Sequence, residues 1–181
     1  MKLLLHICCA PCIAAPLAEL RNSGAKVTGF FFNPNIHPLL EFRKRIRAVE
    51  VFQEQENLEV IYRREYGLNE FLRRIGPDTP MRCMICHSMR LQETAKAALE
   101  GGFDAFSSSL LFSRQQDHVA LKIIGQATGV QLGVPFHYVD LRHLVDDSLE
   151  IARKRALYRQ QYCGCIFSEF ERYKDSDTRK R

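Results

Sequence analysis

Residues 1–24, MKLLLHICCAPCIAAPLAELRNSG, decide the fold of this chain. Lys2 to Ile7 is a short apolar run of the kind that forms a buried strand, and Pro11 to about Asn22 has the pattern of a helix that stops at a Ser-Gly pair. The turn between them carries three cysteines, Cys8, Cys9 and Cys12. Such a turn borders the ligand-binding crevice of an open α/β sheet, and a helix start there would lower the pKa of a thiol.

Strands and helices alternate along the rest of the chain. Further strands are predicted at residues 26–32, 58–62, 104–108 and 134–139. Helices are predicted along the apolar stripe Leu39, Phe42, Ile46, Val49 and Phe52, and at residues 68–75, 86–100, 117–128 and 147–158. This order predicts a doubly wound, mostly parallel α/β sheet with helices on both faces and sites at the carboxyl ends of the strands.

A length of 181 residues suits one domain with its own core. We expect a single α/β metalloenzyme domain over residues 1–173, followed by a polar basic tail at 174–181. No segment approaches the roughly 20 apolar residues of a membrane span, and the opening apolar run is too short for a signal peptide. We therefore expect a cytoplasmic protein, where structural disulfides are disfavoured.

All seven cysteines fall into three tight groups. The second group is Cys83 and Cys86, in RCMICH, and the third is Cys163 and Cys165, in YCGCI. Core packing gives no reason for cysteines to cluster, whereas thiolates two residues apart can reach one metal ion or cluster. Because thiolates are soft ligands, the pattern favours zinc or an iron–sulfur cluster over magnesium or calcium.

The number of thiols indicates more than one role. One tetrahedral zinc or one iron–sulfur cluster uses about four ligands, which leaves three of the seven cysteines. Cys163 and Cys165 flank a glycine and could either complete a second metal site or cycle between dithiol and disulfide. A purely structural zinc site stays open as well. Neither a GxxxxGK[ST] nor a GxGxxG motif is present, so nucleotide chemistry at the first turn is disfavoured.

The formal net charge of +5 permits a nucleic-acid partner without requiring one. Basic residues concentrate at Arg43 to Arg47, at Arg63 and Arg64, at Arg73 and Arg74, at Arg153 to Arg155 and at the final three residues. Such runs suit a phosphate backbone, and they also occur on solvated helix faces.

The motifs, taken in order, resemble the QueH-type epoxyqueuosine reductase family. The matching segments are HxCCAPC at residues 6–12, FFFNPNIHP at 30–38, RCxxC at 82–86 followed by RLxxTAxxA, FDAFSSSLLFS at 103–113, and LYRQQYCGCIFSE at 157–169. An ordered set of this length is far more specific than a single CxxC. Two departures are His87, where an aromatic residue is common, and the stretch Ser113 to His118, which lacks a proline after the serine. Neither touches a cysteine, so they bear only on contacts of that loop.

The resemblance implies an oxidoreductase of tRNA processing that reduces epoxyqueuosine to queuosine at the wobble position, the last step of queuosine biosynthesis. It implies a fold similar to adenine nucleotide α-hydrolase (HUP-like) domains. It also implies a [4Fe-4S] cluster, placed by motif on Cys8, Cys9, Cys83 and Cys86. Cys163 and Cys165 match a redox-active dithiol or the ligands of an additional iron ion, and Cys12 could join either centre.

Reduction of an epoxide to an alkene and water needs two electrons and two protons. Iron can relay electrons and polarise the epoxide oxygen. As proton donor we rank Asp140 first, because it follows the last predicted strand, and then His6, His118 and Tyr162. Asp140 could equally be a turn residue, and His6 a hydrogen-bonded core histidine. The loop from Asn33 to Pro38 reads as a turn or as a substrate-facing loop.

The expected partners are a tRNA that carries epoxyqueuosine and an electron donor that the sequence does not identify. Phosphates would meet the runs Arg43 to Arg47 and Arg153 to Arg155 while the modified base enters the crevice. Two other functions remain open. They are a zinc-stabilised nucleic-acid-binding module and a metal-free thiol–disulfide oxidoreductase.

Overall fold

A computed structural model describes residues 1–76 and 79–175 of the chain. Its centre is a four-stranded sheet in which every pairing is parallel and the strand order is β3-β2-β1-β4. The strands are β1 (Lys2–His6), β2 (Lys26–Phe31), β3 (Val60–Tyr62) and β4 (Ala105–Ser108). The continuous apolar run of β1 suits its central place, because a strand there is buried on both faces.

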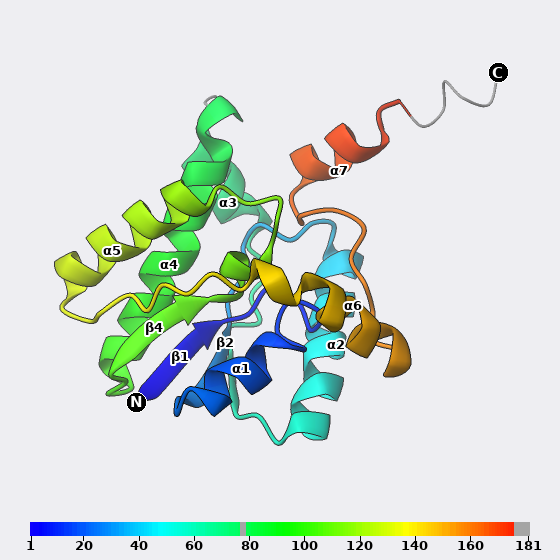
Figure 1. Ribbon diagram of the computed structural model, residues 1–181. Coiled ribbons are helices and arrows are strands. Elements are labelled where there is room, and N and C mark those ends of the chain that lie inside the picture. Colours follow the sequence, from blue (N-terminus) through cyan, green and yellow to red (C-terminus); the bar gives the residue numbers. More distant parts are fainter. Residues whose placement is uncertain (77–78, 176–181) are drawn as a thin grey trace.

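Helices cover both faces of this sheet (Figure 1). On one face, α1 (Pro16–Asn22), α2 (Leu39–Glu56) and α6 (Val145–Lys154) share a core with Leu3 and Leu5 of β1. On the other face, α4 (Arg82–Glu100) and α5 (His118–Leu132) pack around Leu4 and Phe106. The remaining helices are α3 (Leu68–Ile75), α7 (Ile166–Tyr173) and the short turns η1 (Thr79–Met81), η2 (Ser109–Phe112) and η3 (Arg142–Leu144). The doubly wound α/β class expected from the sequence is confirmed.

The first helix begins five residues later than the sequence predicted. It starts at Pro16, and residues 11–15 form turns instead. Pro16 has no N–H to donate to the carbonyl of Cys12, so a helix cannot run through this point, whereas proline is well suited to the first helical position. The expectation that the first cysteines meet the start of a helix is therefore wrong. They lie in an irregular turn between β1 and α1.

Two other boundaries differ from the prediction. Helix α4 starts at Arg82 rather than Cys86, which places both cysteines of the second group in its first turn. The predicted strand at residues 134–139 is reduced to one parallel bridge between Phe136 and Phe106 of β4. The Phe106 N–H donates to the Pro135 carbonyl at 3.0 Å, and the His137 N–H donates to the Phe106 carbonyl at 2.8 Å. Pro135 itself has no N–H, which limits the ladder.

The C-terminal part of the described chain adds helix α7, which the sequence analysis did not predict. The predicted basic tail lies mostly outside the described residues. The single-domain boundary at residue 173 stays a prediction. Within residues 1–76 and 79–175, no helix combines the length and the apolarity needed to cross a membrane.

Candidate metal centre

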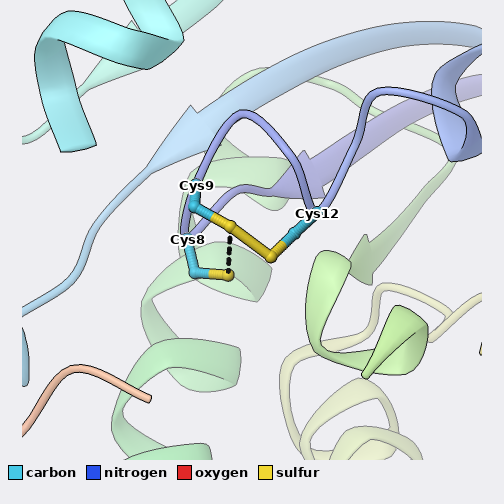
Figure 2. A group of neighbouring side chains, drawn as sticks. All are labelled: Cys8, Cys9 and Cys12. Carbon is cyan, nitrogen blue, oxygen red and sulfur yellow. Dashed lines mark hydrogen bonds between the residues drawn. A yellow bond between two sulfur atoms is a disulfide. The ribbon is translucent and has the colours of Figure 1, made fainter. Parts of the chain in front are cut away.

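The first cysteine group forms a compact sulfur cluster just beyond β1 (Figure 2). Cys9 and Cys12 are joined by a disulfide with their Cα atoms 5.5 Å apart, and the Cys8 Sγ lies 3.8 Å from the Cys9 Sγ. The three sulfur atoms lie within 4.8 Å of one another, and all three residues are buried. Since thiolates are metal ligands, this group could hold a metal ion once the disulfide is reduced.

The end of the neighbouring strand positions Cys8. Ser109, which follows β4, accepts a hydrogen bond from the Cys8 backbone N–H at 3.1 Å, and its hydroxyl lies 3.4 Å from the Cys8 Sγ. Burial raises the pKa of the Cys8 thiol, although Ser109 and the charges of Arg45 and Arg90 oppose the shift. Without a helix start beside it, Cys8 does not gain the lowered pKa that the sequence predicted. A metal ion would have to displace its proton.

The second and third cysteine groups share one cavity of 310 Å³. Cys83 and Cys86 reach it from the first turn of α4, and Cys163 and Cys165 from the segment before α7. Cys165 begins α7, where its sulfur accepts a hydrogen bond from the Ser168 N–H at 3.4 Å. Burial raises the pKa of Cys86 to about 12; the charge of Arg90 opposes this, and those of Cys163 and Cys165 add to it. The four sulfurs are therefore close enough to influence one another electrostatically.

Arg90 of α4 connects this cavity to the first group. The residue is 1% exposed, and its Nε donates to the Cys86 carbonyl at 3.2 Å. Burial alone would lower the pKa of Arg90, yet its pKa is raised, because the charges of one thiol from each group, Cys86, Cys163 and Cys8, outweigh burial. Arg90 also lines the cavity of the second and third groups, so one buried guanidinium stabilises thiolates from segments that are far apart in the sequence.

Arg45 of α2 fixes the third group from the opposite side. Its Nη1 donates to the Cys163 carbonyl at 2.8 Å, and its Nη2 donates to the Tyr162 carbonyl at 3.0 Å. Its Nε forms an ion pair with Glu41 at 2.7 Å. Arg45 belongs to the basic run that was predicted to face tRNA phosphates, but the residue is 1% exposed. Its burial could have been predicted, because residue 45 falls on the apolar helical stripe of Phe42, Ile46 and Val49.

Amide side chains that the sequence analysis did not single out also reach the sulfurs. The Gln160 Nε2 donates to the Cys9 Sγ at 3.0 Å and lies 3.4 Å from the Cys12 Sγ. The Gln116 Oε1 accepts from the His87 Nε2 at 2.8 Å, and the Gln116 Nε2 lies 3.5 Å from the Cys163 Sγ. Asn35, in the loop after β2, lines the cavity, and its Oδ1 has no hydrogen-bond partner among the described residues.

The four candidate proton donors lie in different settings. Asp140 is exposed and accepts from the Arg142 Nε at 2.9 Å, a bond that holds the pKa of its carboxyl well below the usual range, and it does not line the cysteine cavity. Burial lowers the pKa of His6 to about 3, and its ring nitrogens lie 3.0 Å from the Ser108 Oγ and 3.1 Å from the Phe32 carbonyl oxygen. That is the setting of a neutral core histidine. The role of Asp140 stays a prediction, and its low pKa weighs against it.

The other two candidates lie nearer the third cysteine group or the adjoining loop. The His118 Nε2 is 3.2 Å from the Ser113 carbonyl oxygen. The Tyr162 hydroxyl donates to the His37 carbonyl at 2.5 Å, and burial raises the pKa of Tyr162. Tyr162 precedes Cys163 directly and is thus the candidate closest to the thiols along the chain.

Comparison with known sequences identifies the family. The sequence profile described as "Epoxyqueuosine reductase QueH" matches residues 3–171. The chain belongs to the QueH family. It is 40% identical over 172 residues to the QueH epoxyqueuosine reductase of Dehalococcoides mccartyi, covering 95% of this chain and 94% of that protein. The QueH protein of Acinetobacter baylyi is 34% identical, covering 99% and 87%, and that of Thermotoga maritima 32% identical, covering 93% and 91%.

Membership of the QueH family confirms the resemblance seen in the motifs and the enzyme class predicted from it. The protein is an oxidoreductase of the epoxyqueuosine reductase type, which acts in queuosine biosynthesis. Among solved structures, the chain is similar to a predicted subunit of a tRNA methyltransferase from Methanocaldococcus jannaschii, with a TM-score of 0.52 and 12% sequence identity over 89% of this chain and 93% of that one. At this identity the similarity shows a shared fold alone.

Proposed function

We propose that the protein reduces epoxyqueuosine to queuosine in tRNA at an iron centre held by cysteines of its three groups. The observation that carries this proposal is the cavity that Cys83, Cys86, Cys163 and Cys165 share with the buried Arg90. Cys8 and Cys9 lie in the turn after β1, at the carboxyl end of the sheet, which is where an open α/β fold binds its ligands.

The residues fit a [4Fe-4S] cluster in number and in charge. The family motif places the cluster on Cys8, Cys9, Cys83 and Cys86, and all four are available once the Cys9–Cys12 disulfide is reduced. Thiolates buried together need compensating charge, and the buried guanidinium groups of Arg45 and Arg90 provide it. When bound, such a cluster would supply single electrons, and an additional iron ion with an open coordination position would polarise the epoxide oxygen.

The chain itself can supply the rest of the reduction through Cys163 and Cys165. Oxidation of two thiols to a disulfide releases two electrons and two protons, which is the amount needed to convert an epoxide into an alkene and water. Cys163 is exposed and accessible to substrate, whereas Cys165 is buried at the start of α7. The two cysteines act in our proposal as a dithiol; their alternative role is ligation of an additional iron ion.

The substrate tRNA would dock in a groove of 620 Å³ between α2 and the residues that follow α6. Arg43, Lys44 and Arg47 of α2 line one side, and Leu157 and Tyr158 line the other. Of the two basic runs predicted to meet phosphates, the first lines this groove. From the second run, Arg155 lies beside α2, 6.0 Å from the centroid of the Phe52 ring, which supports the predicted placement. Tyr158 offers an aromatic face, and Lys44 lies 5.6 Å from its ring centroid.

Elemental analysis tests the metal centre. Protein purified without oxygen should be brown, with iron and acid-labile sulfide in a ratio near that of the proposed cluster. Colourless protein with zinc would instead indicate the zinc-stabilised nucleic-acid-binding module. Colourless metal-free protein that exchanges disulfides would indicate the thiol–disulfide oxidoreductase, to which the Cys9–Cys12 disulfide gives some support.

The Cys163→Ser, Cys165→Ser double variant tests the third group. We expect it to keep its iron and its tRNA affinity and to lose reduction of epoxyqueuosine, because serine cannot donate electrons. A variant that loses iron as well would assign these residues to the additional iron ion. Full activity of the double variant would remove the third group from the mechanism.

A further inference from the structure

A second pocket, of 550 Å³, adjoins the cysteine cavity. It lies between the loop that follows η2 and the segment that leads into α7, and its lining includes Gln115, Gln116 and Cys163. The same three residues line the inner cavity that holds Cys83, Cys86 and Cys165. The two spaces therefore adjoin, and the exposed Cys163 lies between them.

We call the outer space the amide pocket after its four glutamines, Gln115, Gln116, Gln160 and Gln161. Hydroxyl side chains and the charged Glu171 and Arg172 complete the lining together with Cys163. Amides and hydroxyls present both donors and acceptors, so this lining suits a ligand with several hydrogen-bonding groups. Gln116 and Gln160 are already occupied with the sulfurs of Cys163 and Cys9. Gln115 and Gln161 are exposed at the pocket. The Gln161 Nε2 donates to the Arg159 carbonyl at 3.2 Å, so its Oε1 is the atom that can meet a ligand.

One segment of the chain connects this pocket to the basic groove. Residues 156–158 line the groove, residues 160–163 line the amide pocket, and Cys163, Cys165 and Ser168 line the inner cavity. The segment runs along one side of the molecule from α6 to α7 (Figure 1). A nucleic-acid strand whose phosphates lie in the groove would have a base within reach of the pocket if that base were turned out of its stack, as enzymes that modify bases require.

We propose that the amide pocket binds the modified base of the wobble nucleotide, with Gln115 and Gln161 hydrogen-bonding its polar edge and hydroxyl groups. The base enters from the groove side, and its epoxide-bearing ring reaches Cys163 between the two spaces. This assignment rests on the proposed function and adds the residues that recognise the substrate.

The test compares two tRNAs that differ only at the wobble position, one with epoxyqueuosine and one with guanosine. Affinities and single-turnover rates are measured without oxygen for the iron-loaded wild type, for the Gln115→Ala, Gln161→Ala double variant and for Gln131→Ala. Gln131 is an exposed residue of α5 outside both pockets and serves as the matched control. Iron content and thermal unfolding confirm that each variant is folded and loaded.

We expect the wild type to prefer the modified tRNA and the double variant to lose about ten-fold of that preference, since each missing hydrogen bond costs a few-fold in affinity. Affinity for the guanosine tRNA should be unchanged, because phosphate contacts set it. Gln131→Ala should behave as wild type. If the wild type reduces epoxyqueuosine and the double variant keeps the full preference, the pocket assignment is overturned while the proposed function stands. A wild type that neither reduces the modified tRNA nor prefers it would overturn both.

Discussion

Arg45 shows how the surroundings of one residue decide its role. It belongs to a run of basic residues, yet its neighbours Arg43, Lys44 and Arg47 are exposed and Arg45 is buried against Glu41 and the Cys163 segment. A buried ion pair adds little stability by itself, but the removal of one partner leaves the other charge unpaired. Arg45 is therefore a structural anchor of the third cysteine group.

Replacement of Arg45 by methionine should reduce the free energy of unfolding by about 3–5 kcal/mol, because the buried Glu41 carboxylate loses its cationic partner and keeps only the hydrogen bond from the Tyr158 hydroxyl. Denaturant titration of the iron-loaded protein measures this. The matched control is Arg47→Met, at a side chain that is 78% exposed, which should change stability by less than about 1 kcal/mol. A second variant that combines Arg45→Met with Glu41→Gln should recover part of the stability. Equal effects at positions 45 and 47 would contradict the anchoring role.

Because His37 is buried, we expect the stability of the folded protein to depend on pH. Burial lowers the pKa of His37, and the ring packs against Tyr66 and Phe71. The folded state thus favours the neutral form, while the unfolded chain takes up a proton near pH 6.5. The contribution of His37 to the free energy of unfolding is therefore complete above that pH. It declines as the pH falls below it, by at most about 1.4 kcal/mol per pH unit.

Unfolding free energies at pH 7.5 and 5.5 measure the contribution of His37. A His37→Gln variant should show a shallower decline than the wild type over this interval, because glutamine does not titrate. The same slope in both proteins would show that other groups cause the decline.

At the scale of single residues, the sequence predicted the cysteines but not all of the side chains that contact them. Clustered cysteines are recognisable in any fold, so the three groups could be predicted, and the second and third share one cavity. Asn35 belongs to the loop that the sequence offered as substrate-facing, and it lines the same cavity. Gln160 could not be predicted, because a polar residue in a loop has many uses until the fold brings a sulfur beside it. The pairing of Cys9 with Cys12 was not expected in a reducing compartment either.

At the scale of elements, the four strands of the sheet and most helices were predicted, whereas the segment at 134–139 and the C-terminal helix were not. Helix α3 has the predicted bounds, and α2 follows the predicted stripe, because a repeated apolar spacing requires a packed face. The edge segment at 134–139 has the composition of a strand, but Pro135 limits its pairing to a single bridge. Helix α7 has no buried residue and is only eight residues long, so its apolar stripe of Ile166, Phe170 and Tyr173 was too short to predict a helix.

The packing of α5 on that edge segment gives a prediction for Gly129. A Cβ at this position would lie 2.8 Å from the Val134 carbonyl oxygen and 3.1 Å from the Phe136 nitrogen, both backbone atoms that cannot move aside easily. Gly129→Ala should therefore destabilise the protein by about 1–3 kcal/mol despite the better helix propensity of alanine. Thermal or denaturant unfolding measures it. Val130→Ala, at the adjacent position that is 88% exposed, should stay within about 0.5 kcal/mol of the wild type.

At the scale of the whole molecule, the basic side chains predicted to bind tRNA and the cysteines lie in different regions. The basic groove lies on the α2 side, and the cysteines lie beyond it at the carboxyl edge of the sheet. Neutralising the groove should therefore weaken tRNA binding without changing the preference for the modified base.

The double variant Lys44→Gln, Arg47→Gln should bind an anticodon stem-loop more weakly and with a shallower dependence on salt, by about one unit of the logarithmic slope for each phosphate that is no longer neutralised. Binding titrations from low to high salt measure the slope. Lys96→Gln on α4 removes a charge from the opposite face of the sheet and should leave the slope unchanged. Binding that is insensitive to ionic strength would show that the groove is not the docking surface.

The Cys9–Cys12 disulfide has a consequence for how the enzyme matures. Under the proposed ligand set, Cys9 cannot bind iron until a cellular reductant has delivered two electrons to this bond. Reduction of the disulfide would then have to precede insertion of the cluster. In a newly folded chain that is exposed to oxidants, Cys9 and Cys12 would stay oxidised and would not bind a wrong metal ion.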